Sequence, residues 1–195
     1  MIWILGDLEH FTRLGMKPLG MEPLAVGVTS DADHIITPSR EGPTQAMRRA
    51  LGESEAHGSE VVSWDLHATA TPGDFNEVEM VRSLLPAETL VTARKGTFGH
   101  GMSAGGGWEL TAQYLSWERG EVFPTPLGRN ELNREIAGVH ENFAYDQGCK
   151  APDGVVGKLS MGIGGVNACV ISRPWPAKSE LGRTLEESVA AGSSR

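Results

Sequence analysis

The chain has 195 residues, of which 39% are hydrophobic and 22% are charged, and its formal net charge is -8. This length is enough for one domain with its own core, and the composition is typical of a globular protein rather than a disordered one. The acidic balance argues against a nucleic-acid-binding surface, no apolar run is long enough to span a bilayer, and two cysteines are too few for a disulfide framework or a zinc cluster.

The first half of the chain is predicted to alternate between strands and helices. Residues 1–15 are expected to form a strand and then a short helical turn, and residues 24–28 a second strand. Residues 44–51 place apolar side chains at helical spacing, which predicts a helix. Residues 60–65 are rich in β-formers and are predicted to form the next strand.

A helix and a strand are predicted next, followed by a longer helix. Asp74 is placed to cap the first of these helices, and residues 90–93 are predicted to form the strand. After a loop over 94–100, the longer helix is expected to run to about Trp117. Its apolar side chains point to all sides, which indicates a helix buried between other elements.

The last predicted strands are residues 155–160 and 168–171, after an irregular stretch over 120–154. Strands that alternate with helices indicate an α/β layered fold. Chemically interesting polar residues follow three of the strands, after Trp64, Ala93 and Ser160. Because open α/β folds place ligand sites at the ends of their strands, we expect a site where these three ends meet.

The chain contains 25 glycines, many of them in two clusters at residues 96–107 and 157–165. Glycine gathers where the backbone turns tightly or approaches a ligand closely. One such cluster alone is most simply a set of ordinary turns. Two clusters that lie beside histidine, lysine and asparagine indicate a functional site instead.

Three segments resemble motifs of the β-ketoacyl synthase family, in the same order and at similar spacing. The run His67-Ala-Thr69-Ala-Thr71 resembles the His-Gly-Thr-x-Thr motif of that family. The run from Lys95 to His100, with the small residues after it, resembles the Lys-x-x-x-Gly-His motif and a Gly-Ala-Ala-Gly run.

The third segment, residues 162–167, resembles the closing Gly-Phe-Gly-Gly-Thr-Asn loop of the same family. Residues 30–34 are also similar to a segment upstream of its first histidine. The resemblance covers residues 1–173 and implies the C-terminal half of a thiolase-like αβαβα layered fold. Residues 174–195 are expected to form a polar, loosely ordered tail.

The function that the resemblance implies is decarboxylative condensation of malonyl-acyl carrier protein with an acyl thioester, in fatty-acid or polyketide synthesis. The substrates are carried on the phosphopantetheine of acyl carrier protein, and no metal or organic cofactor is expected. Loss of carbon dioxide leaves negative charge on the thioester oxygen, which two imidazole N–H donors stabilise in a water-poor pocket. By resemblance His67 and His100 are these donors, and Lys95 holds the second histidine region in place.

The other site residues follow from the same resemblance. Glu77 is expected to support the site as the ion-pair partner of Lys95, and Asn167 to support the glycine loop. The threonines are expected to bind the phosphopantetheine arm and the glycine loop to gate the acyl chamber, which gives a substrate-binding set of Thr69, Thr71, Gly162, Ile163, Gly164 and Gly165. Ala68 and Ile163 depart from the family pattern, in which glycine and phenylalanine are usual.

The nucleophilic cysteine of the family lies well before the first histidine, and no cysteine precedes His67 here. Cys149 lies in an irregular stretch and Cys169 in an apolar strand, so neither fits the role. We therefore expect an exposed apolar face, where a cysteine-bearing N-terminal half or a full synthase binds. These and acyl carrier protein are the expected partners. The chain is expected to form a homo- or hetero-oligomer and to be located in the cytoplasm. The alternatives are a non-catalytic accessory subunit and an inactive, truncated remnant.

A more distant alternative is a serine hydrolase that uses Ser103. Residues 101–105 fit the Gly-x-Ser-x-Gly nucleophile elbow of α/β-hydrolases. That fold needs a histidine after the nucleophile, and His140 is the one candidate. Glycines, rather than a strand, precede Ser103, so this alternative ranks second.

Overall fold

The main sheet of the protein has five strands in the order β1-β7-β6-β2-β3. The computed structural model describes residues 2–16, 19–31, 33–37 and 39–174. The strands of the main sheet are β1 (Met21–Ser30), β2 (Val61–Leu66), β3 (Leu90–Ala93), β6 (Val155–Gly162) and β7 (Val166–Pro174). A separate two-stranded sheet joins β4 (Glu121–Val122) to β5 (Cys149–Lys150).

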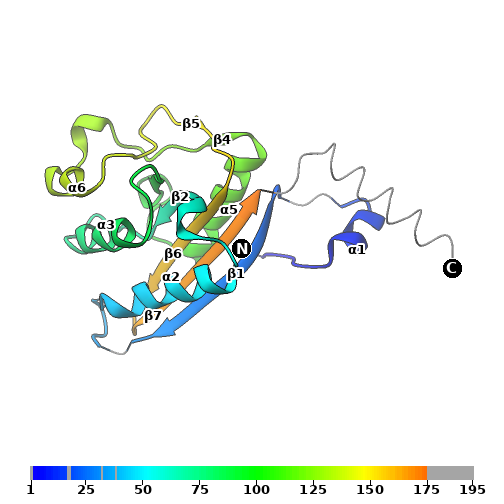
Figure 1. Cartoon of the computed structure of the whole chain (residues 1–195), viewed down its shortest axis with the longest axis horizontal. Coiled ribbons are helices and arrows are strands. Elements are labelled where there is room, and N and C mark those ends of the chain that lie inside the picture. The colour runs from blue at the N-terminus through cyan, green and yellow to red at the C-terminus, as the bar shows by residue number, and fades with distance from the viewer. Residues whose placement is uncertain (1, 17–18, 32, 38, 175–195) are drawn as a thin grey trace.

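The longer helices are α2 (Glu41–Glu53), α3 (Gly73–Leu84) and α5 (Gly105–Glu118). Three shorter α-helices are α1 (Leu8–Arg13), α4 (Lys95–Phe98) and α6 (Arg134–Val139), and the 3-10 turns are η1 (Gly58–Glu60), η2 (Met102–Ala104) and η3 (Arg129–Glu131). Figure 1 shows α2 in front of the sheet, with α5 behind it. The predicted α/β fold class is thus confirmed.

Strand direction decides where the strand ends meet. β2 runs parallel to β3 and to β6, whereas β7 is antiparallel to both β6 and β1. The carboxyl ends of β1, β2, β3 and β6 therefore lie at one edge of the sheet. The segments that follow Leu66, Ala93 and Gly162 start at this edge, as the sequence predicted.

Two hydrophobic cores form on the two faces of the sheet. The larger core joins α2 and α3 to the strands through buried residues that include Met47, Val81 and Leu159. The smaller core packs α5 through Tyr114 and Trp117 against Val156 of β6 and its neighbours. Because side chains alternate between the faces of a strand, one run of mostly apolar residues serves both cores.

Most predicted elements are present, and their ends differ by a few residues. The strand expected at the start of the chain is absent from residues 2–7. There the Trp3 ring instead packs on Tyr114 and its Nε1 donates to Thr111. Asp74 is the second residue of α3 rather than its cap. The tail predicted over residues 174–195 lies outside the described residues from 175 onward, and Pro174 itself ends β7.

Many large apolar side chains of the described residues are exposed, and they gather at the start of the chain, along β1 and near the strand ends. Trp108 on α5 is 38% exposed, so this helix is not covered on all sides, and the prediction that other elements bury it all round is wrong. Ile163 and Val166 at the turn between β6 and β7 are also exposed. Within the described residues, no helix has the length and apolar character needed to cross a membrane.

Gly157 gives a direct test of the packing in this sheet. A Cβ at Gly157 would lie 2.0 Å from the indole ring of Trp64, which is fully buried on the neighbouring strand. We expect Gly157→Ala to lower the free energy of unfolding by about 1–3 kcal/mol, because overpacking displaces the indole. The matched control is Gly52→Ala on the exposed side of α2, where nothing lies within 4 Å.

The control should raise the free energy of unfolding by roughly 0.5–1 kcal/mol, because alanine is the better helix former. Urea unfolding followed by tryptophan fluorescence measures both variants. Equal effects of the two substitutions would contradict the described contact between β2 and β6.

Candidate active site

The backbone around His67 is held by two carboxylates from α3. Glu77 is buried and accepts hydrogen bonds from the N–H groups of His67 and Ala68, at 2.6 and 2.9 Å. Asp74 accepts from the N–H groups of the next two residues, Thr69 and Ala70, both at 2.9 Å. Four consecutive backbone donors thus face one helix, which fixes the turn that follows β2.

The ion pair of Lys95 differs from the prediction. Lys95 Nζ lies 2.7 Å from Oε1 of Glu109 on α5, rather than pairing with Glu77. The expected Lys95–Glu77 ion pair is wrong, because both oxygens of Glu77 already accept backbone N–H groups of the β2 turn. Lys95 also donates to the carbonyl oxygen of His67 and lies 3.3 Å from His67 Nδ1.

His67 and His100 meet at this edge of the sheet. Their ring centroids are 5.6 Å apart and their planes are nearly perpendicular. The N–H of Met102 donates to Nδ1 of His100 at 3.2 Å. Lys95 faces Nδ1 of His67 in the same way. Because Nδ1 faces a donor in each ring, the nitrogen left to donate is Nε2 in both histidines. The arrangement therefore offers two imidazole N–H groups to one small region of space.

The charges around the site keep His67 neutral. The pKa of His67 is lowered from 6.5 to about 3, chiefly by burial, with further contributions from the positive charges of Lys95 and Lys158 and a smaller one from His100. Burial likewise lowers the pKa of Lys95, and Lys158 adds to this effect, whereas Glu109 opposes it. A neutral imidazole keeps one N–H donor and gains no charge that a buried site would have to solvate.

Burial also changes the acidity of Glu77. Burial raises the pKa of Glu77 from 4.5 to about 7, although the N–H groups of His67 and Ala68 act in the opposite direction. Both of its oxygens accept these backbone N–H groups.

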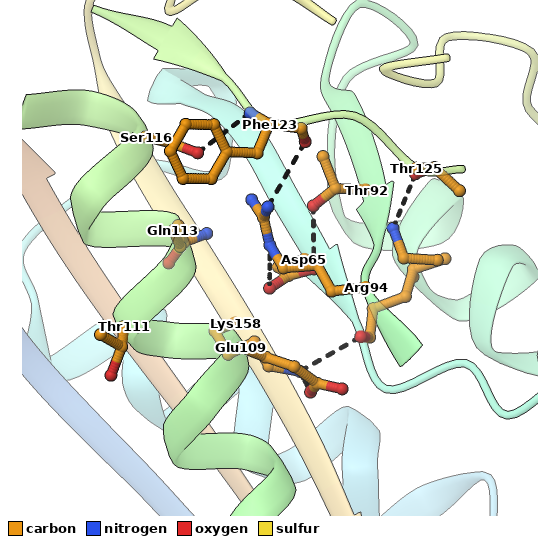
Figure 2. Close-up of polar contacts among 12 residues, drawn as sticks. Asp65, Thr92, Arg94, Glu109, Thr111, Gln113, Ser116, Phe123, Thr125 and Lys158 are labelled. Carbon is orange, nitrogen blue, oxygen red and sulfur yellow. Dashed lines mark hydrogen bonds and ion pairs between the residues drawn. The ribbon is translucent and has the colours of Figure 1, made fainter. Parts of the chain in front are cut away.

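Residues missed by the sequence analysis lie directly behind the histidines. Lys158 of β6 is 2% exposed and pairs with Oε2 of Glu109 at 2.7 Å, so that Glu109 binds two lysines. Beside them Asp65 pairs with Arg94 at 3.0 Å and accepts a hydrogen bond from Thr92. Figure 2 shows Glu109 and Lys158 close together, with the Asp65–Arg94 pair above them.

One signal could have identified Glu109 and Lys158. Each is a charged residue inside a mostly apolar element, and buried charges in proteins are almost always paired. Two such positions of opposite charge on neighbouring elements are therefore expected to meet.

The glycine loop turns the chain from β6 into β7 at the same edge. Gly164 and Gly165 have φ values of 91° and 79°, which favour glycine. Ile163, which follows Gly162 in this loop, is 62% exposed. Asn167 is buried, and its amide donates to the carbonyl of Gly165 and to Asp31. These contacts connect the loop to the end of β1.

The two threonines lie on the turn after β2. Their hydroxyl oxygens are 3.1 Å apart, and Thr71 is exposed, so both are near the surface of the turn. Ala70 between them has a φ of 58°, a conformation that favours glycine, whereas the predicted departure at Ala68 has no such strain.

The two cysteines and Ser103 are the remaining possible nucleophiles. Cys169 is fully buried in β7, where burial raises the pKa of its thiol, and Cys149 is exposed on β5. Ser103 is in η2, but His140 is buried and bonds the carbonyl of Thr89, just before β3. Because Thr89 is at the opposite edge of the sheet from Ser103, the geometry contradicts the serine hydrolase alternative.

Comparison with known proteins places this geometry in a family. Residues 22–127 match the family described as Beta-ketoacyl synthase, C-terminal domain. The chain is 28% identical over 174 residues to 3-oxoacyl-acyl-carrier-protein synthase 1 of Escherichia coli K12, which covers 87% of this chain and 40% of that protein. It is 29% identical over 180 residues to the chloroplastic synthase I of Hordeum vulgare, which covers 89% of this chain and 38% of that protein.

A solved structure shows the same arrangement of elements. The ishigamide ketosynthase/chain length factor has a TM-score of 0.77 to this chain at 25% identity, over 86% of this chain and 41% of that one. The predicted C-terminal half of a thiolase-like layered fold is thereby confirmed. This chain spans about two fifths of the length of the proteins that it matches.

The double ion pair of Glu109 should contribute strongly to stability. We expect Glu109→Gln to lower the free energy of unfolding by about 3–5 kcal/mol, because two buried ammonium groups lose their counter-ion. The control is Glu79→Gln, which breaks the exposed Arg40–Glu79 pair and should cost less than about 1 kcal/mol. Urea titration measures both, and a similar loss in the two variants would show that the Glu109 cluster is solvated.

The lowered pKa of His67 should appear in the pH dependence of stability. Since the unfolded chain binds the proton first, His67 reduces the free energy of unfolding as pH falls from 6.5 toward 3. We expect His67→Gln to lose less stability than the unchanged chain over this range, with His10→Gln as an exposed control. A difference between His67→Gln and the unchanged chain that stays constant with pH would contradict a neutral, buried His67.

Proposed function

This chain belongs to the β-ketoacyl synthase family, and from that premise we propose that it supplies the His/His/Lys part of a decarboxylative condensation site. The proposed substrates are malonyl-acyl carrier protein and an acyl thioester. The observation that carries the proposal is the pair of imidazoles at 5.6 Å, each with Nδ1 engaged and Nε2 left to donate.

In the proposed reaction the bond between the malonyl α-carbon and its carboxylate breaks, and carbon dioxide leaves. The electron pair moves toward the thioester oxygen and gives an enolate. His67 and His100 donate hydrogen bonds to that oxygen as its charge develops, which stabilises the transition state. The α-carbon then attacks the acyl thioester on a cysteine, the new carbon–carbon bond forms and the cysteine thiolate leaves.

The neutral state of His67 fits this role. An imidazole with a low pKa stays uncharged at neutral pH, so it donates a hydrogen bond and there is no imidazolium ion to protonate the enolate. Lys95 holds the ring through His67 Nδ1 and the carbonyl oxygen of His67, so it positions the donor and has no part in proton transfer.

The glycine loop and the threonines are proposed to bind the substrate arm. Thr69 and Thr71 present hydroxyl groups on the exposed turn after β2, where a phosphopantetheine amide could bond them. Ile163 extends from the loop that Asn167 holds, which supports a gate beside the histidines. No metal or organic cofactor is part of the proposed reaction.

The proposed partners follow from the part of the relatives that this chain covers. The names of the bacterial and plant relatives include acyl carrier protein, and the solved structure is that of a ketosynthase/chain length factor. We therefore propose acyl carrier protein as the substrate carrier and a cysteine-bearing ketosynthase half as the protein partner, in the cytoplasm. The exposed apolar residues on β1 and α5 support a surface that this partner covers.

Reconstitution tests the proposal. The chain is co-expressed with a cysteine-bearing N-terminal half, purified as a complex and supplied with acyl- and malonyl-acyl carrier protein. We expect condensation product from the complex and none from either part alone. His100→Ala in this chain should lower the decarboxylation rate by about 10²–10³, the usual effect of removing one oxyanion donor.

The control variant is His57→Ala, which changes an exposed histidine before η1 and should leave the rate unchanged. A stable complex that binds acyl carrier protein but makes no product would favour the accessory-subunit alternative. Failure of the folded chain to bind any cysteine-bearing half would favour the remnant.

A further inference from the structure

Lys158 is buried, and its ammonium group lies among three oxygen atoms, two from backbone carbonyls and one from a carboxylate. Its Nζ lies 3.1 Å from the carbonyl oxygen of Leu66, 2.6 Å from that of Leu159 and 2.7 Å from Glu109 Oε2. It donates hydrogen bonds to the two carbonyls, and its contact with Glu109 is an ion pair. A buried ammonium group depends on such a counter-ion and on such backbone acceptors, because burial of an unpaired charge is costly.

The three oxygen atoms around the ammonium group belong to three different elements. Leu66 ends β2, Leu159 lies on β6 itself, and Glu109 is on α5. The sheet register places Lys158 directly beside Asp65, one residue before Leu66. One positive charge therefore joins two parallel strands to the helix behind them.

The backbone on both sides of His67 is held by the two lysines that share Glu109. Lys158 binds the carbonyl of Leu66, the residue before His67, and Lys95 binds the carbonyl of His67 itself. Glu109 bridges the two ammonium groups through its two oxygens. Together with the bond from the His67 N–H to Glu77, this leaves the peptide units around His67 little freedom to rotate.

We propose that Lys158 is a positioning residue of the site, an internal cation that holds Glu109 and the end of β2 so that Lys95 can orient His67. The importance of His67 for catalysis rests on the proposed function, but the cluster of Lys158, Glu109 and Lys95 does not. A purely structural role would affect stability alone. The positioning role also affects the electrostatic environment of His67.

The charged and titratable groups around His67 are Lys95, Lys158, His100, Glu77 and Glu109. Lys158 is one of the positive charges that lower the pKa of His67, after burial and Lys95. Replacing it with methionine removes this charge and leaves a side chain of similar length.

The first test is a proton NMR titration of the histidine ring signals in the full chain, with His67 assigned through His67→Gln. We expect Lys158→Met to move the midpoint of the His67 titration to a pH higher by about 1. Lys158→Arg keeps the charge and should restore the low midpoint. Lys150→Met changes an exposed lysine on β5 and should have no effect. A folded Lys158→Met chain with an unchanged midpoint would overturn the proposal.

The second test needs no variant and covers the case in which Lys158→Met does not fold. The full chain is treated briefly with acetic anhydride, and acetylation at each lysine is measured by mass spectrometry. Lys158 should react at least about tenfold more slowly than Lys150 in the native chain, and equally fast in urea. Equal native rates would show that the ammonium is not held in the cluster and would overturn the proposal.

These tests separate the two proposals, because neither needs condensation activity. An inactive reconstituted complex with a shifted His67 titration in Lys158→Met would sustain the role of Lys158 and reject the condensation reaction. An active reconstituted complex, with an unchanged His67 titration in Lys158→Met, would sustain the condensation reaction and reject the role of Lys158.

Discussion

The carboxylate of Glu109 lies between the ammonium groups of Lys95 and Lys158, and all three side chains are almost fully withdrawn from water. Charges in such an environment are costly unless each is paired, and loss of one partner leaves the others uncompensated. The cluster is therefore satisfied only when α5, β6 and the segment after β3 keep their present arrangement. The position of His67 follows from this arrangement, because both lysines also bind carbonyls at the end of β2.

The same cluster determines the charge state of the site. Two positive charges share one carboxylate, so the region beside His67 is electropositive and disfavours an imidazolium ion. It favours negative charge on a bound oxygen for the same reason. Glu77 completes the turn from the other side, where it binds backbone N–H groups and leaves the lysines to Glu109. The site thus combines neutral donors with fixed positive charge behind them.

The sequence allowed much of the fold and part of the site to be predicted, for identifiable reasons. β3 was predicted at its observed bounds, because a short β-rich run between loops has few alternatives. His67, His100 and Lys95 lie in local motifs, so their convergence could be expected from the strand ends. Glu109 was missed because it interrupts an apolar helix, and partners across the sheet cannot be found from local spacing. The expected first strand is absent because the apolar residues at the start of the chain have no strand partner in the described part of the chain.

The most direct test of this site is the tautomer of each histidine, read from long-range proton–nitrogen NMR correlations at neutral pH. The contacts of Lys95 with His67 Nδ1 and of the Met102 N–H with His100 Nδ1 predict that both rings carry their proton on Nε2. Both donors would then be free to bind an oxyanion. A proton on Nδ1 of either ring would contradict the paired donors on which the proposed chemistry depends.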